Sequence, residues 1–125
     1  KKIVYLTFDN GYENGYTESI LNTLREEKAP ATFFLTGHYL TSATDLVKTM
    51  VKDGHIIGNH SYGHPNMARL SAEEMKKEWK RFDDKLNEDE YAEILDVNSG
   101  NNVEINGVKI KAADLMEIFY ELFVA

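Results

Sequence analysis

The side chains best suited to chemistry in this chain are two histidines, His60 and His64, which stand four residues apart. Neutral imidazole is the commonest metal ligand in proteins, and two imidazoles at this spacing can reach one ion from a turn or a helix. Pro65 follows directly, and because the residue before a proline avoids helical geometry, a loop site is favoured over a helical one. The alternative is that the two histidines only bridge loops through hydrogen bonds.

Asp9 and Asn10 form a second polar pair, placed directly after the apolar segment 3–8. A structural alternative exists here too, because Asp and Asn favour tight turns and Asn10-Gly11 is a common turn pair. This alternative competes strongly for Asn10 and less strongly for Asp9. Whether either residue belongs to a site depends on the elements that position it.

Three strands are expected to carry these residues. Segments 3–8 and 31–36 are rich in β-branched and aromatic residues with little polar alternation, which is typical of strands buried on both faces. Segment 55–60 is the third expected strand. Gly54, a natural helix stop, comes directly before it.

Amphipathic segments between and after the strands predict three helices, over 17–28, from near Ser42 to Gly54, and over 71–86. Two pairs of residues three apart indicate capping boxes at the starts of the second and third helices, Ser42 with Asp45 and Ser71 with Glu74. The chain therefore alternates strand and helix three times over 1–86.

Each step from one strand to the next takes about 25–30 residues, the size of a right-handed crossover unit. The strands should therefore be parallel, with the helices outside. Sites in such folds form where the carboxyl ends of the strands meet. Polar residues follow every strand: Asp9 and Asn10 the first, His38 the second, and His60 with His64 the third. The sequence thus predicts that they converge.

Residues 87–125 have a different character, and we expect them to form a tail packed on the same domain. Asn106-Gly107 separates two alternating runs, 103–105 and 108–110, which is a strong signal for a type I′ hairpin. An amphipathic helix is expected from Ala112 to Phe123. The tail is therefore a β-hairpin plus a helix, unlike the units before it.

Composition excludes several classes of function. The chain has 125 residues and a formal net charge of −7, which argues against a nucleic-acid partner. The basic residues of 76–81 are interleaved with Glu74, Glu78, Asp83 and Asp84, a pattern that predicts a solvated helix face. The absence of cysteine excludes disulfides and thiolate metal sites. No apolar run is long enough for a membrane span, and no signal peptide is visible where the chain starts at Lys1.

Two segments resemble a known family. Thr7-Phe8-Asp9-Asn10-Gly11-Tyr12 and His60-Ser61-Tyr62-Gly63-His64-Pro65 are similar to the first and second motifs of the NodB-type polysaccharide deacetylases, carbohydrate esterase family 4. Residues 32–37 and 54–60 fit the same family, so the resemblance covers about 2–86. It implies an α/β fold made of the first three βα units of a (β/α) deacetylase barrel with parallel strands, followed by the hairpin-helix tail.

The resemblance also implies roles. Asp9 matches the family's catalytic base, and His60 and His64 match two ligands of a divalent metal ion such as zinc. Most members carry an Asp, the third ligand, at the position of Asn10. The spore-cortex peptidoglycan deacetylases, which act on muramic acid on the way to the muramic δ-lactam, carry Asn there and also a Thr-Gly-His like the one that ends at His38. This branch implies a cell-wall or extracellular hydrolase of amide bonds in peptidoglycan, active in sporulation.

The later motifs of the family, an Arg-Pro segment and a Leu-x-x-His segment that supplies the acid, are not found, since no Arg follows Arg81 and no His follows His64. His38 could reach the site as a metal or substrate contact, as could Asn10. Tyr12 and Tyr62, and also Tyr16, could stack on sugar rings. Three functions stay open: an active deacetylase, a non-catalytic metal- or glycan-binding fragment, and a structural or self-associating module that forms a homo-oligomer.

Overall fold

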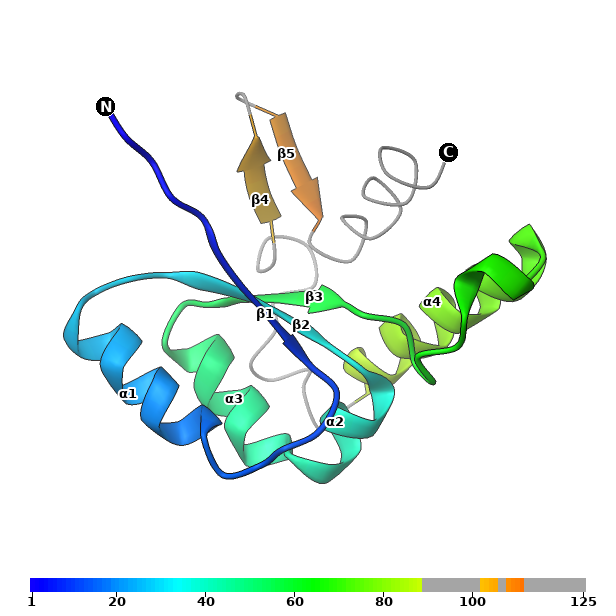
Figure 1. Ribbon diagram of the computed structural model, residues 1–125, viewed down its shortest axis with the longest axis horizontal. Coiled ribbons are helices and arrows are strands. Elements are labelled where there is room, and N and C mark those ends of the chain that lie inside the picture. The colour runs from blue at the N-terminus through cyan, green and yellow to red at the C-terminus, as the bar shows by residue number, and fades with distance from the viewer. Residues whose placement is uncertain (89–101, 106–107, 112–125) are drawn as a thin grey trace.

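The computed structural model describes residues 1–88, 102–105 and 108–111. Its centre is a parallel sheet in the order β1-β2-β3, formed by β1 (Leu6–Asn10), β2 (Ala31–Leu35) and β3 (Ile56–Asn59) (Figure 1). The register places Asn10 opposite Leu35 and Leu35 opposite Asn59. All three carboxyl ends therefore lie at one edge of the sheet, as the crossover lengths predicted.

Four helices surround this sheet in the part of the chain that the structure describes, α1 (Thr17–Glu26), α2 (Gly37–Ser42), α3 (Thr44–Lys52) and α4 (Ala72–Leu86). Helices α1 and α3 contact each other along one face of the sheet, and α4 contacts both β3 and α2 (Figure 1). A short 3₁₀ turn, η1 (Met67–Arg69), leads into α4. None of the described helices is long and apolar enough to cross a membrane.

The second predicted helix is confirmed as α3, but the capping box predicted for it at Ser42 and Asp45 was wrong. Ser42 ends α2 instead of capping a helix, and its hydroxyl donates to the His38 carbonyl at 2.8 Å. Thr36 caps α2 by accepting from the Tyr39 amide, whereas α3 begins after Ala43 without a side-chain cap. The capping box at Ser71 is confirmed, with reciprocal bonds between Ser71 and Glu74.

The core lies between the sheet and its helices, and its central residues are almost fully buried: Leu21, Phe33, Leu35, Tyr39, Leu40, Val47, Met50, Ile57 and Phe82. Among the three strands, β2 contributes the most buried side chains because it has a neighbouring strand on each side. The prediction that 3–8 is buried on both faces was wrong, since Ile3 and Val4 are 64% and 80% exposed. Within the described residues β1 pairs only with β2, so its outer edge is open. The apolar side chains of 3–6 stay exposed because none of the described elements covers them.

The predicted hairpin is confirmed as β4 (Asn102–Ile105) and β5 (Val108–Lys111), which pair antiparallel with Ile105 opposite Val108. Val103 lies opposite Ile110, as the alternation predicted. The turn residues 106–107 and the helix expected over 112–123 lie outside the described residues. The division of the chain at 86/87 stays a prediction.

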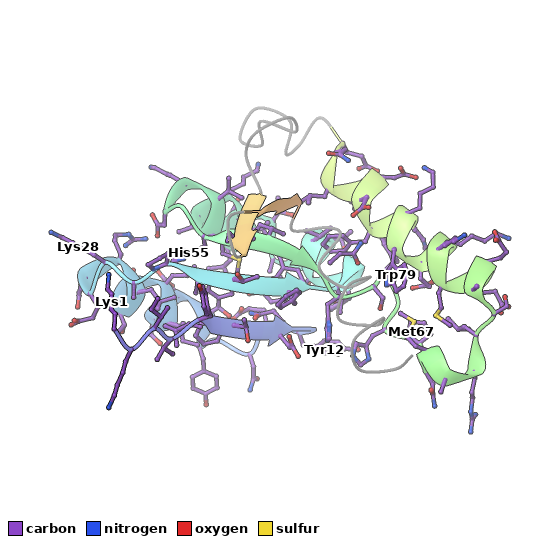
Figure 2. All side chains as sticks on the ribbon, turned by 90° about the horizontal axis from the view of Figure 1, so that it is seen from above. Lys1, Tyr12, Lys28, His55, Met67 and Trp79 are labelled. Carbon is purple, nitrogen blue, oxygen red and sulfur yellow. The ribbon has the colours of Figure 1, made fainter. Side chains whose placement is uncertain are left out.

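His55 lies at the end of the sheet opposite the predicted site, and it is structural, not exposed (Figure 2). Its Nδ1 accepts from the Ala31 amide at 3.1 Å, and its ring meets the Phe33 ring edge-on at 5.3 Å between centroids. Burial lowers the pKa of His55, Asp53 opposes this shift and Arg25 adds to it. The imidazole is therefore held neutral in the folded chain.

This burial predicts a loss of stability in acid. Because the pKa of His55 is lower in the folded chain than the usual 6.5, the unfolded chain binds the extra proton first. The free energy of unfolding should therefore fall as pH drops below about 6.5. Urea denaturation of the parent and of His55→Phe between pH 5 and 8 measures this, and the variant should have the shallower pH slope. Equal slopes would contradict the prediction.

Candidate active site

All the predicted site residues except Asn10 and Tyr16 line one pocket of about 490 Å³ at the carboxyl end of the strands. Asp9 comes from the end of β1, His38 from the start of α2, and His60 and His64 from the loop after β3. Tyr12 marks this end of the sheet in Figure 2. Residues far apart in sequence therefore meet here, as predicted, because the three strands run in the same direction and their carboxyl ends lie together.

His60 and His64 lie next to each other, with ring centroids 4.8 Å apart and planes tilted by 55°. Burial lowers the pKa of His60, the Asp9 carboxylate opposes this shift, and the neighbouring His64 adds to it. His60 is thus neutral near pH 7, with a ring lone pair available to a cation or a proton.

The loop that carries the histidines, 60–64, has an uncommon backbone. Ser61 and His64 have φ of 65° and 49°, in the left-handed region of the backbone that residues other than glycine rarely adopt. The His60 amide donates to the Leu35 carbonyl at 2.9 Å, and the His64 amide donates to Ser61 Oγ at 3.0 Å. The loop geometry predicted from Pro65 is confirmed, and these hydrogen bonds stabilise the turn.

Tyr62 joins this loop to the loop after β2. Its carbonyl accepts from the Gly37 amide at 3.0 Å, and a Cβ on Gly37 would come within 2.3 Å of the Tyr62 ring. The Arg81 guanidinium lies over the same ring, 3.8 Å from its centroid. Much of the Tyr62 ring is therefore used in packing, and only glycine fits at position 37. Contact of Tyr62 with substrate stays a prediction.

Tyr12 and His38 form a second pair of neighbouring rings in the pocket. Their ring centroids lie 4.7 Å apart, and the Tyr12 side chain is 79% exposed, which leaves it free to meet a ligand at the mouth of the pocket. Tyr16, 68% exposed, lies before α1 and does not line this pocket. Sugar stacking on Tyr12 stays a prediction.

Asn10 is not brought to the pocket. Side chains of neighbouring strand residues point to opposite faces, so Asp9 and Asn10 separate at the end of β1. Asn10 lies beside the Tyr39 hydroxyl, which donates to Glu13 Oε2 at 2.6 Å. Burial, together with Glu13, raises the pKa of Tyr39 to about 12. These contacts favour a structural role for Asn10, close to the turn alternative, and metal or substrate contact by this residue stays a prediction.

Sequence reasoning missed the residues that hold the loop in place. Glu78 and Asp83 were expected on a solvated helix face, but both bond into the region of the histidines and are half-buried. Asn59, fully buried before His60, joins them. Charge alternation along α4 could not separate these two carboxylates from their exposed neighbours, because the contact that distinguishes them is made by a distant loop.

The donor set fits a divalent ion in part. Two adjacent imidazoles suit a borderline cation such as zinc. In the described ranges, however, no group of three or more His, Cys, Asp or Glu side chains is arranged to hold a metal. Catalytic zinc sites commonly have three protein ligands and one exchangeable position. The described residues thus provide two metal ligands, not a complete coordination sphere.

A family model described as polysaccharide deacetylase matches residues 1–93, and the chain belongs to this family. The chain is 60% identical over 88 residues to an uncharacterised protein of Geobacillus stearothermophilus. It is 45% identical over 91 residues to the peptidoglycan-N-acetylmuramic acid deacetylase PdaA of Bacillus subtilis. A solved structure of a family 4 carbohydrate esterase from Bacillus anthracis superposes with a TM-score of 0.64 at 51% identity.

The matches cover only part of the length of these proteins. The alignments span 70% and 73% of this chain but 33% of each of the two relatives, and 66% of this chain but 40% of the Bacillus anthracis structure. The chain thus corresponds to the N-terminal part of a deacetylase barrel, and the expected family and fold are confirmed.

Proposed function

We propose that this chain carries the base and the metal-ligand pair of a metal-dependent N-deacetylase for N-acetylated glycan. The observation that carries the proposal is the pocket in which Asp9, His38, His60 and His64 meet. Peptidoglycan is the proposed substrate and the cell wall the proposed site of action, because a relative 45% identical over 91 residues is named for that substrate. Sporulation is the proposed setting.

The reaction is hydrolysis of an acetamide. Water adds to the amide carbonyl, the C–N bond breaks, and the products are acetate and a free amine on the sugar. Asp9 takes the proton of the attacking water, since its carboxylate lies at the exposed rim where substrate enters. A divalent ion held by His60 and His64 would polarise the amide carbonyl and the water.

The leaving amine needs a proton. His38 is the remaining imidazole in the pocket, and its ring lies beside that of Tyr12. We propose His38 as the first residue to test for this role. The alternative is that the acid belongs to a part of the barrel outside the matched third of the relatives, in which case this chain would bind metal or glycan without turnover.

Zinc binding and acetate release test the proposal together. His60→Ala should weaken zinc binding by about 10-fold or more and lower acetate release from N-acetylated peptidoglycan glycan, because half of the ligand pair is lost. Competition with a chromophoric chelator measures the first quantity, and an enzymatic acetate assay with and without EDTA measures the second. Ala substitution of Lys52, an exposed residue at the end of α3 that does not line the pocket, is the control.

Three results separate the alternatives. Release that EDTA abolishes supports the deacetylase. Zinc binding without release from a folded chain supports a non-catalytic binding fragment. A folded parent chain that binds neither zinc nor glycan and releases no acetate overturns both proposals and leaves a structural or self-associating module.

A further inference from the structure

The loop 60–64 adopts a conformation that its own residues do not favour. Left-handed φ values at Ser61 and His64 cost free energy that glycine would not lose. Such a backbone persists only where surrounding contacts determine it. The contacts that hold this loop therefore decide where the two imidazoles point.

Asn59 links the loop to α4 with both ends of its side chain. Its Nδ2 donates to the Trp79 carbonyl and to Asp83 Oδ1, each at 3.0 Å, and its Oδ1 accepts from the Ser61 amide at 2.9 Å. Two acceptors on the helix fix which way the amide faces, so its oxygen must face Ser61. Ser61 in turn fixes the backbone at His64, because its Oγ accepts a hydrogen bond from the His64 amide.

A second carboxylate of the same helix holds the loop directly. Glu78 Oε2 accepts from the Gly63 amide at 2.7 Å, within the turn between the two histidines. Helix α4 is itself seated by Phe82, which is fully buried in the core. The loop is thus tied at two points to an element that cannot shift without disturbing the core.

We propose that Asp83 is a positioning residue for the histidine pair, acting through Asn59 and Ser61, with Glu78 as a second support. The carboxylate charge strengthens the hydrogen bond from Asn59, and that bond selects the amide orientation on which the Ser61 turn depends. Outer residues of this kind commonly set the affinity of a metal site without touching the ion. The proposal rests on the proposed function only for the identity of the ligand, not for the loop conformation.

Asp83 is the residue to change, because it is half-exposed whereas Asn59 is fully buried and its loss could unfold the chain. Asp83→Ala removes the acceptor, and Asp83→Asn keeps an acceptor oxygen. Asp84→Ala is the matched control, since Asp84 is the neighbouring carboxylate, 64% exposed and paired with Lys80. All variants are compared in the full chain, under conditions where circular dichroism reports them folded.

Two readouts are measured. Hydrogen exchange followed by mass spectrometry should be about 10-fold faster or more in peptides covering 60–64 of Asp83→Ala, with β2 peptides unchanged. Zinc affinity should fall about 10–100-fold. Asp83→Asn should restore both toward parent values, and Asp84→Ala should alter neither.

Parent-like exchange in 60–64 of Asp83→Ala overturns the proposal. Equal acceleration in the loop and in β2 also overturns it, because a general loss of stability would explain that pattern. If the parent binds no zinc, the metal part of the proposed function fails, and the exchange data alone decide the role of Asp83.

Discussion

Acetate release should fall about 10²–10⁴-fold when Asp9 is replaced by asparagine, the range that loss of a general base commonly produces. Asn has nearly the same shape as Asp but cannot accept the proton of the attacking water. Asp9 is exposed at the rim of the pocket and lies outside the core, so the fold should be unaffected. The removal of its charge also lets the pKa of His60 fall further, which keeps that ligand neutral.

The measurement is the initial rate of acetate release at fixed zinc and substrate, beside zinc affinity for the same samples. Asp45→Asn, an exposed carboxylate at the start of α3, is the control for loss of one negative charge. A rate that vanishes with unchanged zinc affinity assigns Asp9 to the proton transfer. A parent-like rate in Asp9→Asn would remove it from the mechanism.

Phe82→Ala should lower the free energy of unfolding by about 3–5 kcal/mol. The Phe82 ring is fully buried between α4 and the sheet, and its removal both loses apolar burial and leaves a cavity. Since the free energy of unfolding of small domains is commonly only about 5–15 kcal/mol, this change would remove a large share of the stability. The loop that α4 supports should also lose order, because Asp83 and Glu78 move with the helix.

Urea denaturation followed by circular dichroism measures this loss. Tyr12→Ala is the matched control, since it also removes an aromatic ring but one that is 79% exposed, and it should change stability by no more than about 0.5 kcal/mol. A loss below about 1 kcal/mol in Phe82→Ala would mean that the helix is seated by other contacts.

Much of the candidate site was predictable from the sequence because it depends on topology. Alternating strands and helices at crossover spacing require parallel strands, and parallel strands bring their carboxyl ends together. Asp9, His38, His60 and His64 could therefore be placed in one pocket before any contact was known. The capping box at Ser71 and the hairpin of 103–110 were predictable for a similar reason, since both depend on neighbours close in sequence.

Other features depended on contacts between distant residues. Ser42 has the local pattern of a helix cap, yet it ends α2, the extra helix that Thr36 caps after β2, and α3 begins without a side-chain cap. Asp9 and Asn10 are adjacent in sequence but serve different faces of β1, and only the presence of Tyr39 on one face explains where Asn10 points. Segment 3–6 is apolar and still exposed, because burial needs a partner that composition cannot supply.

The amino-acid sequence alone was sufficient for the family, through the resemblance of segments 7–12 and 60–65 to its motifs. It was also sufficient for the direction of the strands and the residues that meet at their carboxyl ends, because periodicity and chain connectivity are local properties. The fold was needed to show that His64 sits in a left-handed turn and that Asn59, Glu78 and Asp83 hold it there. Side-chain hydrogen bonds act over a few ångströms, so they depend on which segments are adjacent in space, and no pattern along the chain encodes that adjacency residue by residue.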